Sequence, residues 1–513
     1  MYAAGRDIMA VLKDWLEDIE YSVLTGDTSE TVSDVIYDSR KAAPGTVFLC
    51  MKGSVTDSHD FIVQVYEKGC RSFVVEKELD ELALPQGADD INIIKTADSR
   101  KALAYLSAAR FGKPAEKLKL IGITGTKGKT TTSYMLKNML EYCGRKVGVI
   151  GTNGCEINGM HIPTKNTTPE SYELNERFAM MADAGCEFAV MECSSQGFKM
   201  SRTDGLTFEY GLFLNLSNDH IGPLEHADFA EYLFCKSRLL LQSKHMIMNA
   251  DDEHMAEVIR QAGKDPADLR GSGIYTFGID SAADLTASGF SFVKADSYIG
   301  IDFRTSGLCE AAFTLSMPGL FNVSNALSVI ETGALLGLPL DKVAESFKHI
   351  HVNGRNEVVC KTENFAVIVD YAHNEVSMRT LLATLREYEH KRLVVVFGCG
   401  GNRSKDRRTS MGAAAADAAD FSVFTADNSR YEKTEDIIND IKEAYFAAGG
   451  RAENCVEIPD RRSAIRYAME NARKDDIIAV IGKGHEDYQE ENGVRRHFLD
   501  SEVILEIKKE LGL

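Results

Sequence analysis

An eleven-residue glycine-rich segment is the first part of the chain whose residue types could do chemistry. Residues 122–132 read Gly-Ile-Thr-Gly-Thr-Lys-Gly-Lys-Thr-Thr-Thr, after an apolar run at 118–123 and before an amphipathic run that Gly144 would end. Glycines in such a turn let backbone N–H groups approach phosphate oxygens, while a lysine and a hydroxyl serve the β- and γ-phosphates and Mg²⁺. The segment therefore predicts ATP and Mg²⁺ binding, with Lys129 and Thr130 in the last two roles.

The segment departs from the strict phosphate-loop pattern at one position. Ile123 stands where the first glycine belongs, although Gly122 and Gly125 flank it. An ordinary glycine-rich turn between a strand and a helix is the alternative interpretation. The intact Gly-Lys-Thr favours the phosphate loop. The expected nucleotide contacts are Gly125, Thr126, Lys127, Gly128, Lys129, Thr130 and Thr131.

Polar side chains follow two later apolar runs that we expect to be strands. Glu192 follows the run at 188–191, and His220 lies shortly after the run at 210–215. The carboxyl ends of parallel strands open into a crevice where ligands bind. A carboxylate and an imidazole there could hold a divalent ion, but a solvated acid and a structural histidine are the alternatives. Lys236, in an apolar helical segment, is typical of a snorkelling or paired lysine.

The last third of the chain repeats the alternation of apolar runs and polar loops. The loops follow runs at 365–369, 393–397, 421–424 and 477–481 and begin Asp370-Tyr-Ala-His373, Gly398-Cys-Gly-Gly-Asn-Arg403, Asp427-Asn-Ser-Arg430 and Gly482-Lys-Gly-His-Glu486. Glycines before basic residues at a strand end favour capture of a phosphate or carboxylate over a simple basic turn. We expect the four loops to meet at one edge of a parallel sheet.

Length and pattern indicate several α/β domains. The chain has 513 residues, too many for one hydrophobic core. Gly112 and Pro114 mark a linker, and strands alternate with helices on both sides of 352, which is typical of parallel sheets. We predict three domains: an N-terminal α/β domain at 1–115, a central parallel sheet with the phosphate loop at 116–352, and a Rossmann-like sheet at 353–513.

Composition excludes several classes of partner. The formal net charge of −19 argues against nucleic acid, and no apolar run is long enough to cross a membrane. The N-terminus lacks the apolar core of a secretory signal, and the eleven cysteines include no C-x-x-C pair. We expect a cytoplasmic monomer that acts on small molecules.

Taken together, the motifs resemble those of the Mur ligase family, most closely the type that adds the third amino acid to UDP-N-acetylmuramoyl-dipeptide (the MurE type). The resemblance spans nearly the whole chain. It rests on the phosphate loop and on Tyr37-Asp-Ser39-Arg40, Asn166-Thr-Thr-Pro-Glu170, Met191-Glu-Cys-Ser-Ser195, Asn215-Leu-Ser-Asn-Asp-His220, Pro318-Gly-Leu-Phe-Asn322-Val-Ser-Asn325, Gly354-Arg-Asn-Glu357, Asp370-Tyr-Ala-His373 and Gly482-Lys-Gly-His-Glu486.

The resemblance implies a role for each matched position. It assigns catalytic roles to Lys129, Glu192, His220 and Lys236, with Thr130, Glu192 and His220 as metal ligands and Lys236 as a carbamylated lysine that helps to position Mg²⁺. Asn322 and Arg355 would contact the nucleotide, and Ser39 would lie near uracil. Asn166, Thr167, Thr168, Ser194 and Arg202 would bind the UDP-sugar peptide. Gln196 and Met200 depart from residues found in some members.

The implied reaction transfers the ATP γ-phosphoryl group to the D-glutamate carboxylate, and an amine then attacks the acyl phosphate. The sequence identifies no base for that amine, and His373 is not assigned the role. Six positions are assigned to the acceptor by the resemblance and favour meso-diaminopimelate, although Ser429 replaces a proline: Arg403, Asp427, Asn428, Arg430, Gly482 and Glu486. Lys127 and the stretch at 219–226 look like forms common among lysine-adding members. L-lysine is therefore the alternative, and another diamino acid is a third.

Two other classes of function remain open. A related amide ligase, such as a folylpolyglutamate synthetase, would share the central and C-terminal motifs, but Asp38-Ser39-Arg40 argues against folate. A nucleotide-binding protein without catalysis would not need Lys129, Glu192, His220 and Lys236 together.

Overall fold

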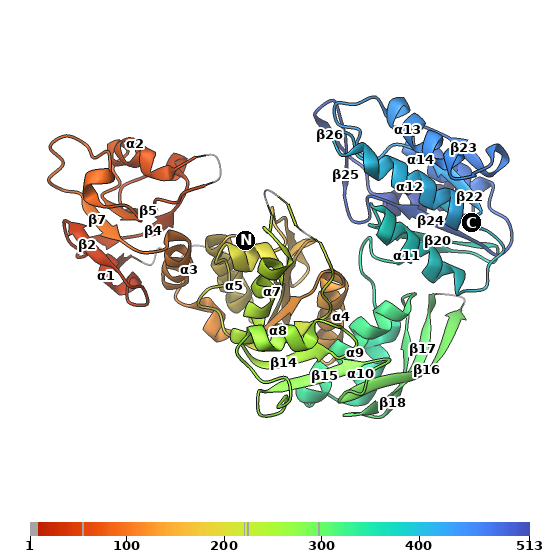
Figure 1. The fold of residues 1–513 in the computed structure, drawn as a ribbon, viewed down its shortest axis with the longest axis horizontal. Helices are drawn as coiled ribbons and strands as arrows, with labels where there is room; N and C mark the ends of the chain where they lie inside the picture. Colours follow the sequence, from red (N-terminus) through yellow and green to blue (C-terminus); the bar gives the residue numbers. More distant parts are fainter. Residues whose placement is uncertain (1–8, 54–55, 220, 223–224, 296–297) are drawn as a thin grey trace. The chain divides into compact units, whose positions relative to one another are not determined.

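The computed structural model of the protein describes residues 9–53, 56–219, 221–222, 225–295 and 298–513 (Figure 1). It divides into two units, Met1–Asp284 and Leu285–Leu513. The α/β class that the sequence predicts is confirmed, because parallel strands joined by helices dominate both units. The domain boundaries at 115 and 352 remain predictions.

The first unit begins with a five-stranded sheet in the order β2-β7-β6-β5-β4. Its strands are β2 (Ser22–Thr25), β4 (Asp34–Ile36), β5 (Thr46–Leu49), β6 (Ser72–Val75) and β7 (Asn92–Lys95), and all pairs except β2 with β7 are parallel. The accompanying elements are β1 (Ala10–Val11), β3 (Thr31–Val32), α1 (Leu12–Trp15), α2 (Ile62–Glu67) and α3 (Ser99–Arg110). The Asp98 side chain caps α3 by accepting from the Lys101 N–H, as the N-cap rule expects.

The same unit continues into a larger sheet that carries the phosphate loop. Its strand order is β11-β10-β9-β12-β8-β13-β14-β15, parallel from β9 to β15. The strands are β8 (Lys119–Thr124), β9 (Val147–Gly151), β10 (Gly154–Ile157), β11 (Met160–Ile162), β12 (Phe188–Glu192), β13 (Phe208–Phe213), β14 (Ser243–Asn249) and β15 (Ile274–Gly278). The helices are α4 (Lys129–Tyr142), α5 (Ser171–Asp183), α6 (Ser195–Lys199), α7 (Phe229–Leu241) and α8 (Met255–Gln261).

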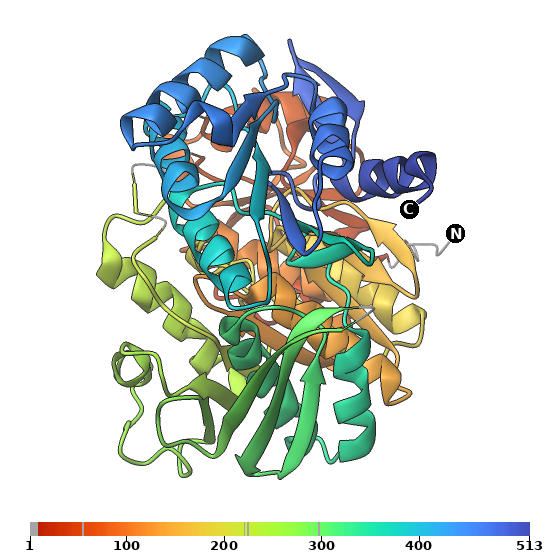
Figure 2. The same cartoon turned by 90° about the vertical axis from the view of Figure 1, so that its right-hand side faces the viewer.

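The second unit opens with three antiparallel strands, drawn in green in Figure 2. They are β16 (Leu285–Lys294), β17 (Ile299–Gly307) and β18 (Ala311–Leu315), and α9 (Leu320–Leu335) and α10 (Leu340–Ser346) follow them. A six-stranded sheet then has the order β19-β20-β24-β21-β22-β23. Its strands are β19 (Glu357–Lys361), β20 (Phe365–Asp370), β21 (Leu393–Phe397), β22 (Phe421–Phe424), β23 (Cys455–Glu457) and β24 (Asp476–Ile481).

The six-stranded sheet is parallel except for β19. Its helices are α11 (Glu375–Arg386), α12 (Lys405–Ala418), α13 (Thr434–Ala447), α14 (Arg461–Glu470) and α15 (Asp500–Leu511), and a hairpin of β25 (Tyr488–Glu491) and β26 (Val494–His497) precedes α15. Every residue of β21 and β24 is buried. Helices on both faces of a parallel sheet produce such continuous apolar runs, which explains why the sequence located these strands.

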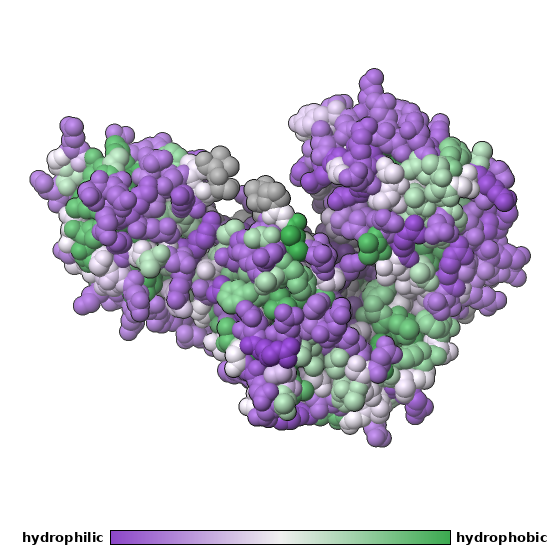
Figure 3. Space-filling model, viewed as in Figure 1, coloured by the Kyte–Doolittle hydropathy of each residue, from purple (hydrophilic) through white to green (hydrophobic). Residues whose placement is uncertain are grey.

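The face of the molecule drawn in Figure 3 is mostly hydrophilic, and its apolar residues gather in several patches. In the described part of the chain, no helix has both the length and the apolar character that a membrane span requires.

Candidate active site

The phosphate loop joins the end of β8 to the start of α4. Gly128 immediately precedes the helix with a φ of 89°, a left-handed conformation that glycine adopts without a steric penalty. Because the N-cap residue is a glycine, no side chain at this position accepts a hydrogen bond from the first N–H groups of α4. This arrangement fits a phosphate group, because the N–H groups at the start of a helix and the helix dipole attract an anion.

Two lysines converge on one carbonyl group of the loop. Lys129 Nζ donates to the Gly125 oxygen over 2.7 Å, and Lys236 Nζ, from α7, donates to the same oxygen over 2.8 Å. Lys236 is only 1% exposed. Burial, and next the charge of Lys129, lower the pKa of Lys236 well below the usual value of a lysine. The structure thus brings together two of the predicted catalytic residues.

Glu192 ends β12 beside the phosphate loop. It accepts a hydrogen bond from Thr130 Oγ1 at 3.0 Å and another from the Thr152 N–H at 2.8 Å. Two of the three predicted metal ligands therefore lie together, while His220 lies outside the described residues. Across the residues that the structure describes, no cluster of three or more His, Cys, Asp or Glu side chains is arranged to hold a metal ion. Thr152, which the sequence did not single out, contacts Glu192 from the end of β9.

The positions predicted to bind the sugar peptide form a second cluster next to Glu192. Thr168 Oγ1 donates to the Glu192 carbonyl at 2.9 Å and accepts from the Ser194 N–H at 2.9 Å. Arg202 Nη1 donates to the Thr168 carbonyl at 3.0 Å. Thr167 contacts Thr152 through their hydroxyls at 3.0 Å, and Asn166 is exposed in the same loop.

Ser39 lies in a short 3₁₀ turn, Ser39–Lys41, that follows β4. Its carbonyl accepts from Lys68 Nζ at 2.8 Å. The neighbouring Tyr37 and Asp38 line a small hollow. Hydrogen bonds from Arg40 lower the pKa of Asp38 to about 2, so this carboxylate is ionised at neutral pH.

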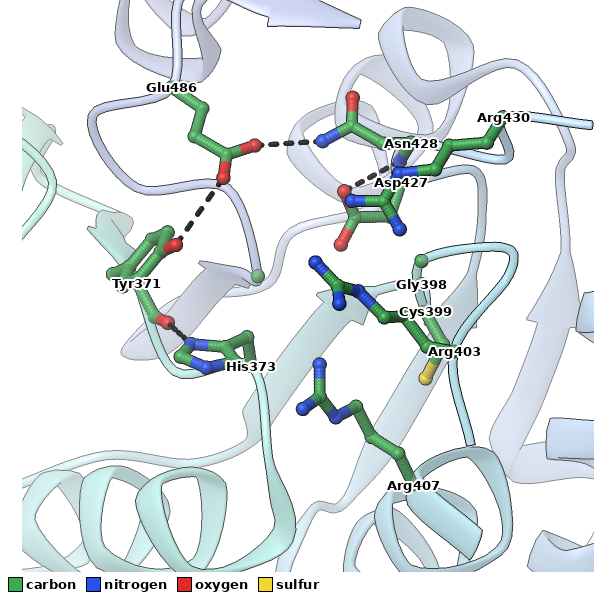
Figure 4. Close-up of a pocket in the computed structure, with 12 residues that line it drawn as sticks. Tyr371, His373, Gly398, Cys399, Arg403, Arg407, Asp427, Asn428, Arg430 and Glu486 are labelled. Carbon is green, nitrogen blue, oxygen red and sulfur yellow. Dashed lines mark hydrogen bonds between the residues drawn. The ribbon is translucent and has the colours of Figure 1, made fainter. Parts of the chain in front are cut away.

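The second unit contains a polar pocket of about 240 Å³ at the carboxyl ends of β20, β21, β22 and β24 (Figure 4). The four loops meet at one edge of the sheet, as the sequence predicted. The lining residues are Tyr371, His373, Gly398, Cys399, Gly400, Arg403, Arg407, Asp427, Asn428, Arg430, Gly482 and Glu486. All six positions that we expected to bind the acceptor are among them. The six lining residues that were not assigned this role are Tyr371, His373, Gly398, Cys399, Gly400 and Arg407.

Charge in this pocket is mixed. Three guanidinium groups, from Arg403, Arg407 and Arg430, share it with the carboxylates of Asp427 and Glu486. Such a set suits a molecule that carries both carboxylate and ammonium groups. Burial lowers the pKa of His373, and the charge of Arg407 lowers it further, so this imidazole is neutral at physiological pH.

The β25–β26 hairpin fixes Arg430. The Arg430 N–H donates to the Glu490 carbonyl at 2.9 Å, and the Asn492 N–H donates to the Arg430 carbonyl at 2.5 Å. These bonds hold Arg430 at a φ of 52°, which is uncommon for a residue with a side chain. Its Nη1 donates to the Gly401 carbonyl at 2.6 Å. Hydrogen bonds therefore hold Arg430 both at its backbone and at its guanidinium group.

Asn428 is held in one orientation. Its Nδ2 donates to Glu486 Oε2 at 2.8 Å, and its Oδ1 accepts from the Glu490 N–H at 2.9 Å. Lys483 Nζ lies 3.4 Å from the same Oδ1 and 3.6 Å from Glu486. Lys483 is fully buried, and burial lowers its pKa. The sequence placed Lys483 within a motif but did not predict this contact.

Two glycines touch beside the pocket. A Cβ atom on Gly354 would lie 2.1 Å from the His485 nitrogen, and one on Gly484 would lie 2.8 Å from the Gly354 carbonyl oxygen. Arg355, which follows Gly354, lies over the Tyr371 ring, with its guanidinium carbon 4.8 Å from the ring centroid. Asn322, the other predicted nucleotide contact in this unit, is fully buried at the start of α9 and donates to the Pro318 carbonyl at 2.7 Å.

Comparison with known proteins identifies the family. The model of the Mur ligase middle domain matches residues 123–333, and the model described as the Mur ligase, glutamate ligase domain matches residues 354–484. The UDP-N-acetylmuramoyl-L-alanyl-D-glutamate–2,6-diaminopimelate ligase of Clostridium perfringens is 37% identical over 499 residues, covering 97% of this chain and 99% of the relative. The chain belongs to the Mur ligase family, and the predicted membership is confirmed.

Two further comparisons extend over the same length. The UDP-N-acetylmuramoyl-L-alanyl-D-glutamate–2,6-diaminopimelate ligase 1 of Clostridium acetobutylicum is 37% identical over 503 residues, covering 98% of this chain and 99% of the relative. A solved structure of a UDP-N-acetylmuramoyl-L-alanyl-D-glutamate–2,6-diaminopimelate ligase matches with a TM-score of 0.71 at 27% identity, covering 99% of this chain and all of the other.

Proposed function

We propose that this protein is an ATP-dependent ligase that joins 2,6-diaminopimelate to UDP-N-acetylmuramoyl-L-alanyl-D-glutamate, a step in making peptidoglycan precursors. The observation that carries the proposal is the pocket of the second unit, in which three guanidinium groups face two carboxylates. Relatives that match this chain over almost their whole length bear the name of that activity.

ATP would bind at the phosphate loop, with Lys129 beside the β- and γ-phosphates. Residues 125–131 of the loop, with Asn322 and Arg355, are the proposed nucleotide contacts. Mg²⁺, when bound, supplies positive charge beside the phosphates. Thr130, Glu192 and His220 are its proposed ligands, and the contact between Thr130 and Glu192 supports this set. A hydroxyl and a carboxylate offer the oxygen atoms that Mg²⁺ prefers.

The reaction that we propose has two steps. The γ-phosphoryl group of ATP passes to the terminal D-glutamate carboxylate and forms an acyl phosphate. Phosphate is a good leaving group, whereas the oxygen of a free carboxylate is a poor one. The acceptor amine then attacks the carbonyl carbon, phosphate departs and an amide forms. The amine must give up a proton to do so. Lys129, with Mg²⁺ when it is bound, would offset negative charge that develops near the loop.

The acceptor is proposed from charge complementarity. Diaminopimelate has one carboxylate more than L-lysine at the end that does not react. Arg430, anchored by the hairpin and by Gly401, would bind one carboxylate, and Arg403 another. Asp427 and Glu486 would accept hydrogen bonds from an ammonium group. L-lysine would leave one guanidinium without an anion, which costs affinity.

Lys236 is proposed to be carbamylated. Only a neutral amine adds CO₂, and burial together with the charge of Lys129 favours the neutral amine at this lysine. The carbamate would turn a cation into an anion beside the phosphate loop. A Lys236→Ala variant should be inactive and should recover part of its activity in millimolar formate or acetate, because a small carboxylate can enter the space that the side chain leaves.

The wider organisation is proposed along the same lines. Residues 1–115 would hold the uridine nucleotide near Ser39, residues 116–352 would bind ATP, and residues 353–513 would bind the acceptor. Asn166, Thr167, Thr168, Ser194 and Arg202 would contact the sugar peptide. We propose that the protein acts in the cytoplasm as a monomer.

The decisive experiment measures phosphate release and product mass with ATP, Mg²⁺, the UDP-muramoyl dipeptide, and either meso-diaminopimelate or L-lysine. We expect a product heavier by one diaminopimelate residue and little product with L-lysine. Phosphate release that does not depend on the muramoyl dipeptide would refute the ligase assignment. Equal or better use of L-lysine would refute the choice of acceptor.

A further inference from the structure

We infer that the buried pair of Arg461 and Asp500 is a positioning device for the acceptor pocket. The inference rests on the proposed function, because it concerns how the same pocket is held. Arg461 is the first residue of α14, Asp500 is the first residue of α15, and both side chains are fully buried. Neither residue lines the pocket.

The contacts of Arg461 divide between its partner and two loops. Its Nε and Nη2 donate to the two Asp500 carboxylate oxygens, both at 2.7 Å. Its Nη1 donates to the Ala426 carbonyl at 3.1 Å, and its Nη2 also donates to the Ile481 carbonyl at 3.0 Å. One guanidinium thus ties together the chain segments that follow β22 and β24.

These two carbonyls lie immediately before pocket residues. Ala426 precedes Asp427, and Ile481 precedes Gly482. The two loops approach closely, since a Cβ atom on Gly482 would lie 3.2 Å from Asp427 Oδ2. A shift of either carbonyl would therefore move Asp427 relative to Glu486, which follows in the second loop. The distance between two carboxylates that bind one ammonium group depends on this connection.

Electrostatics support the same role. A cation in the first turn of a helix is opposed by the helix dipole, so α14 gains nothing from an arginine at this position. Burial disfavours the charge, but the Asp500 carboxylate, and after it Asp427 and Glu486, raise the pKa of Arg461. Arg461 is therefore a fixed positive charge that interacts with both pocket carboxylates.

A comparable ion pair lies at the amino end of β24, whereas Arg461 contacts the carboxyl end of that strand. Arg392 donates through Nε to Asp476, the first residue of β24, at 3.1 Å and through Nη2 to the Asn471 carbonyl at 3.0 Å. Asp476 is fully buried, as Asp500 is. This pair also combines a carboxylate and a carbonyl, but it joins the amino ends of the strands, away from the pocket. A substitution in this pair therefore measures what a buried ion pair of this kind contributes to stability, without an effect on the pocket.

The experiment compares Arg461→Lys with Arg392→Lys in the full-length protein. A lysine keeps the charge but cannot reach both carbonyls and the carboxylate at once. We expect Arg461→Lys to raise KM for meso-diaminopimelate at least tenfold, with KM for ATP and for the muramoyl dipeptide within twofold of wild type. Arg392→Lys should lower the thermal midpoint and leave all three KM values within twofold. Asp500→Asn, which leaves Arg461 without its charged partner, should shift KM for diaminopimelate in the same direction.

The outcomes separate the possibilities. If Arg461→Lys is less stable but binds diaminopimelate as wild type does, the pair is only structural and the inference is wrong. Equal increases in all three KM values would also contradict it. If Arg461→Lys does not fold, Asp500→Asn decides by the same criterion. A wild-type protein that fails to use diaminopimelate would refute the proposed acceptor, which is a different result.

Discussion

The two sheet edges that carry chemistry are built in different ways. In the first unit, the phosphate loop is one continuous segment between β8 and α4, and its shape depends on Gly128 and on the start of the helix. In the second unit, the pocket combines residues from four loops that are far apart in the sequence. A continuous site depends on its own backbone, whereas a dispersed site depends on the polar contacts that hold its loops in register.

This difference predicts how each site should fail. Damage to the phosphate loop should remove the chemical step, because ATP serves that step whatever the acceptor. Damage to the dispersed pocket should weaken binding of one substrate and leave the others unaffected.

The largest effect is expected at Lys129. Lys129→Ala should lower kcat by about 10³-fold, as loss of a charge aimed at a developing anion does. The measurement is phosphate release at saturating diaminopimelate. Lys146→Ala, which removes an exposed lysine just before β9, is the matched control and should retain wild-type kcat. A fall in kcat of less than tenfold for Lys129→Ala would mean that the phosphate loop does not serve the chemical step.

The next effect is expected at Arg430. Arg430→Ala should raise KM for diaminopimelate by about 10- to 100-fold, because a charge-assisted hydrogen bond contributes about 1.5–3 kcal/mol. KM for L-lysine should change little. Arg495→Ala, which removes a 63% exposed arginine of the adjacent hairpin, is the control. Unchanged use of diaminopimelate would show that Arg430 does not select the acceptor.

A smaller effect is expected when the hydrogen bond between Asn428 and Glu486 is replaced by a repulsion between two acids. Asn428→Asp replaces the Nδ2 donor with an oxygen 2.8 Å from Glu486, so two carboxylates would face each other. We expect KM for diaminopimelate to rise about tenfold at pH 8 and by less at pH 6, where one of the two acids takes up a proton. A pH-independent KM would contradict this explanation.

The last effect concerns stability in acid and not catalysis. Burial, and next the charge of Arg355, lower the pKa of His485 from 6.5 to about 4. The unfolded chain therefore binds the proton more readily, and this contribution to stability is complete above pH 6.5 and is lost as the pH falls towards 4. The full loss is on the order of 3 kcal/mol.

Thermal unfolding of His485→Gln and wild type between pH 7 and pH 4.5 would test this prediction. The thermal midpoint of the variant should fall less steeply with acidification. His497→Gln is the control of opposite sign, because Glu502 raises the pKa of that exposed histidine and its small contribution is lost as the pH rises. Parallel curves for His485→Gln and wild type would contradict the assignment.

The same contrast explains what the sequence could predict. Strands such as β21 and β24 are buried on both faces and appear as unbroken apolar runs, so their positions were confirmed. The phosphate loop was visible because its residues are adjacent. Placing Arg403, Arg430 and Glu486 in one pocket required only the rule that parallel strands end at the same edge.

Other contacts depend on information that no local pattern contains. Arg461 and Arg462 are neighbours of the same type, yet Arg461 is fully buried whereas Arg462 is 36% exposed and pairs with Glu506 and Glu510. Which of the two faces inward follows from how α14 packs. Lys483 likewise became meaningful only when the fold placed Asn428 beside it.

The contact between Gly354 and Gly484 constrains how this protein could evolve. Each residue occupies space that the other's missing side chain leaves open, so a replacement at either position cannot be rescued by a replacement at the other. We expect libraries randomised at both positions together to return the parental pair alone. The two sites would then appear invariant in such a selection although neither carries a functional group.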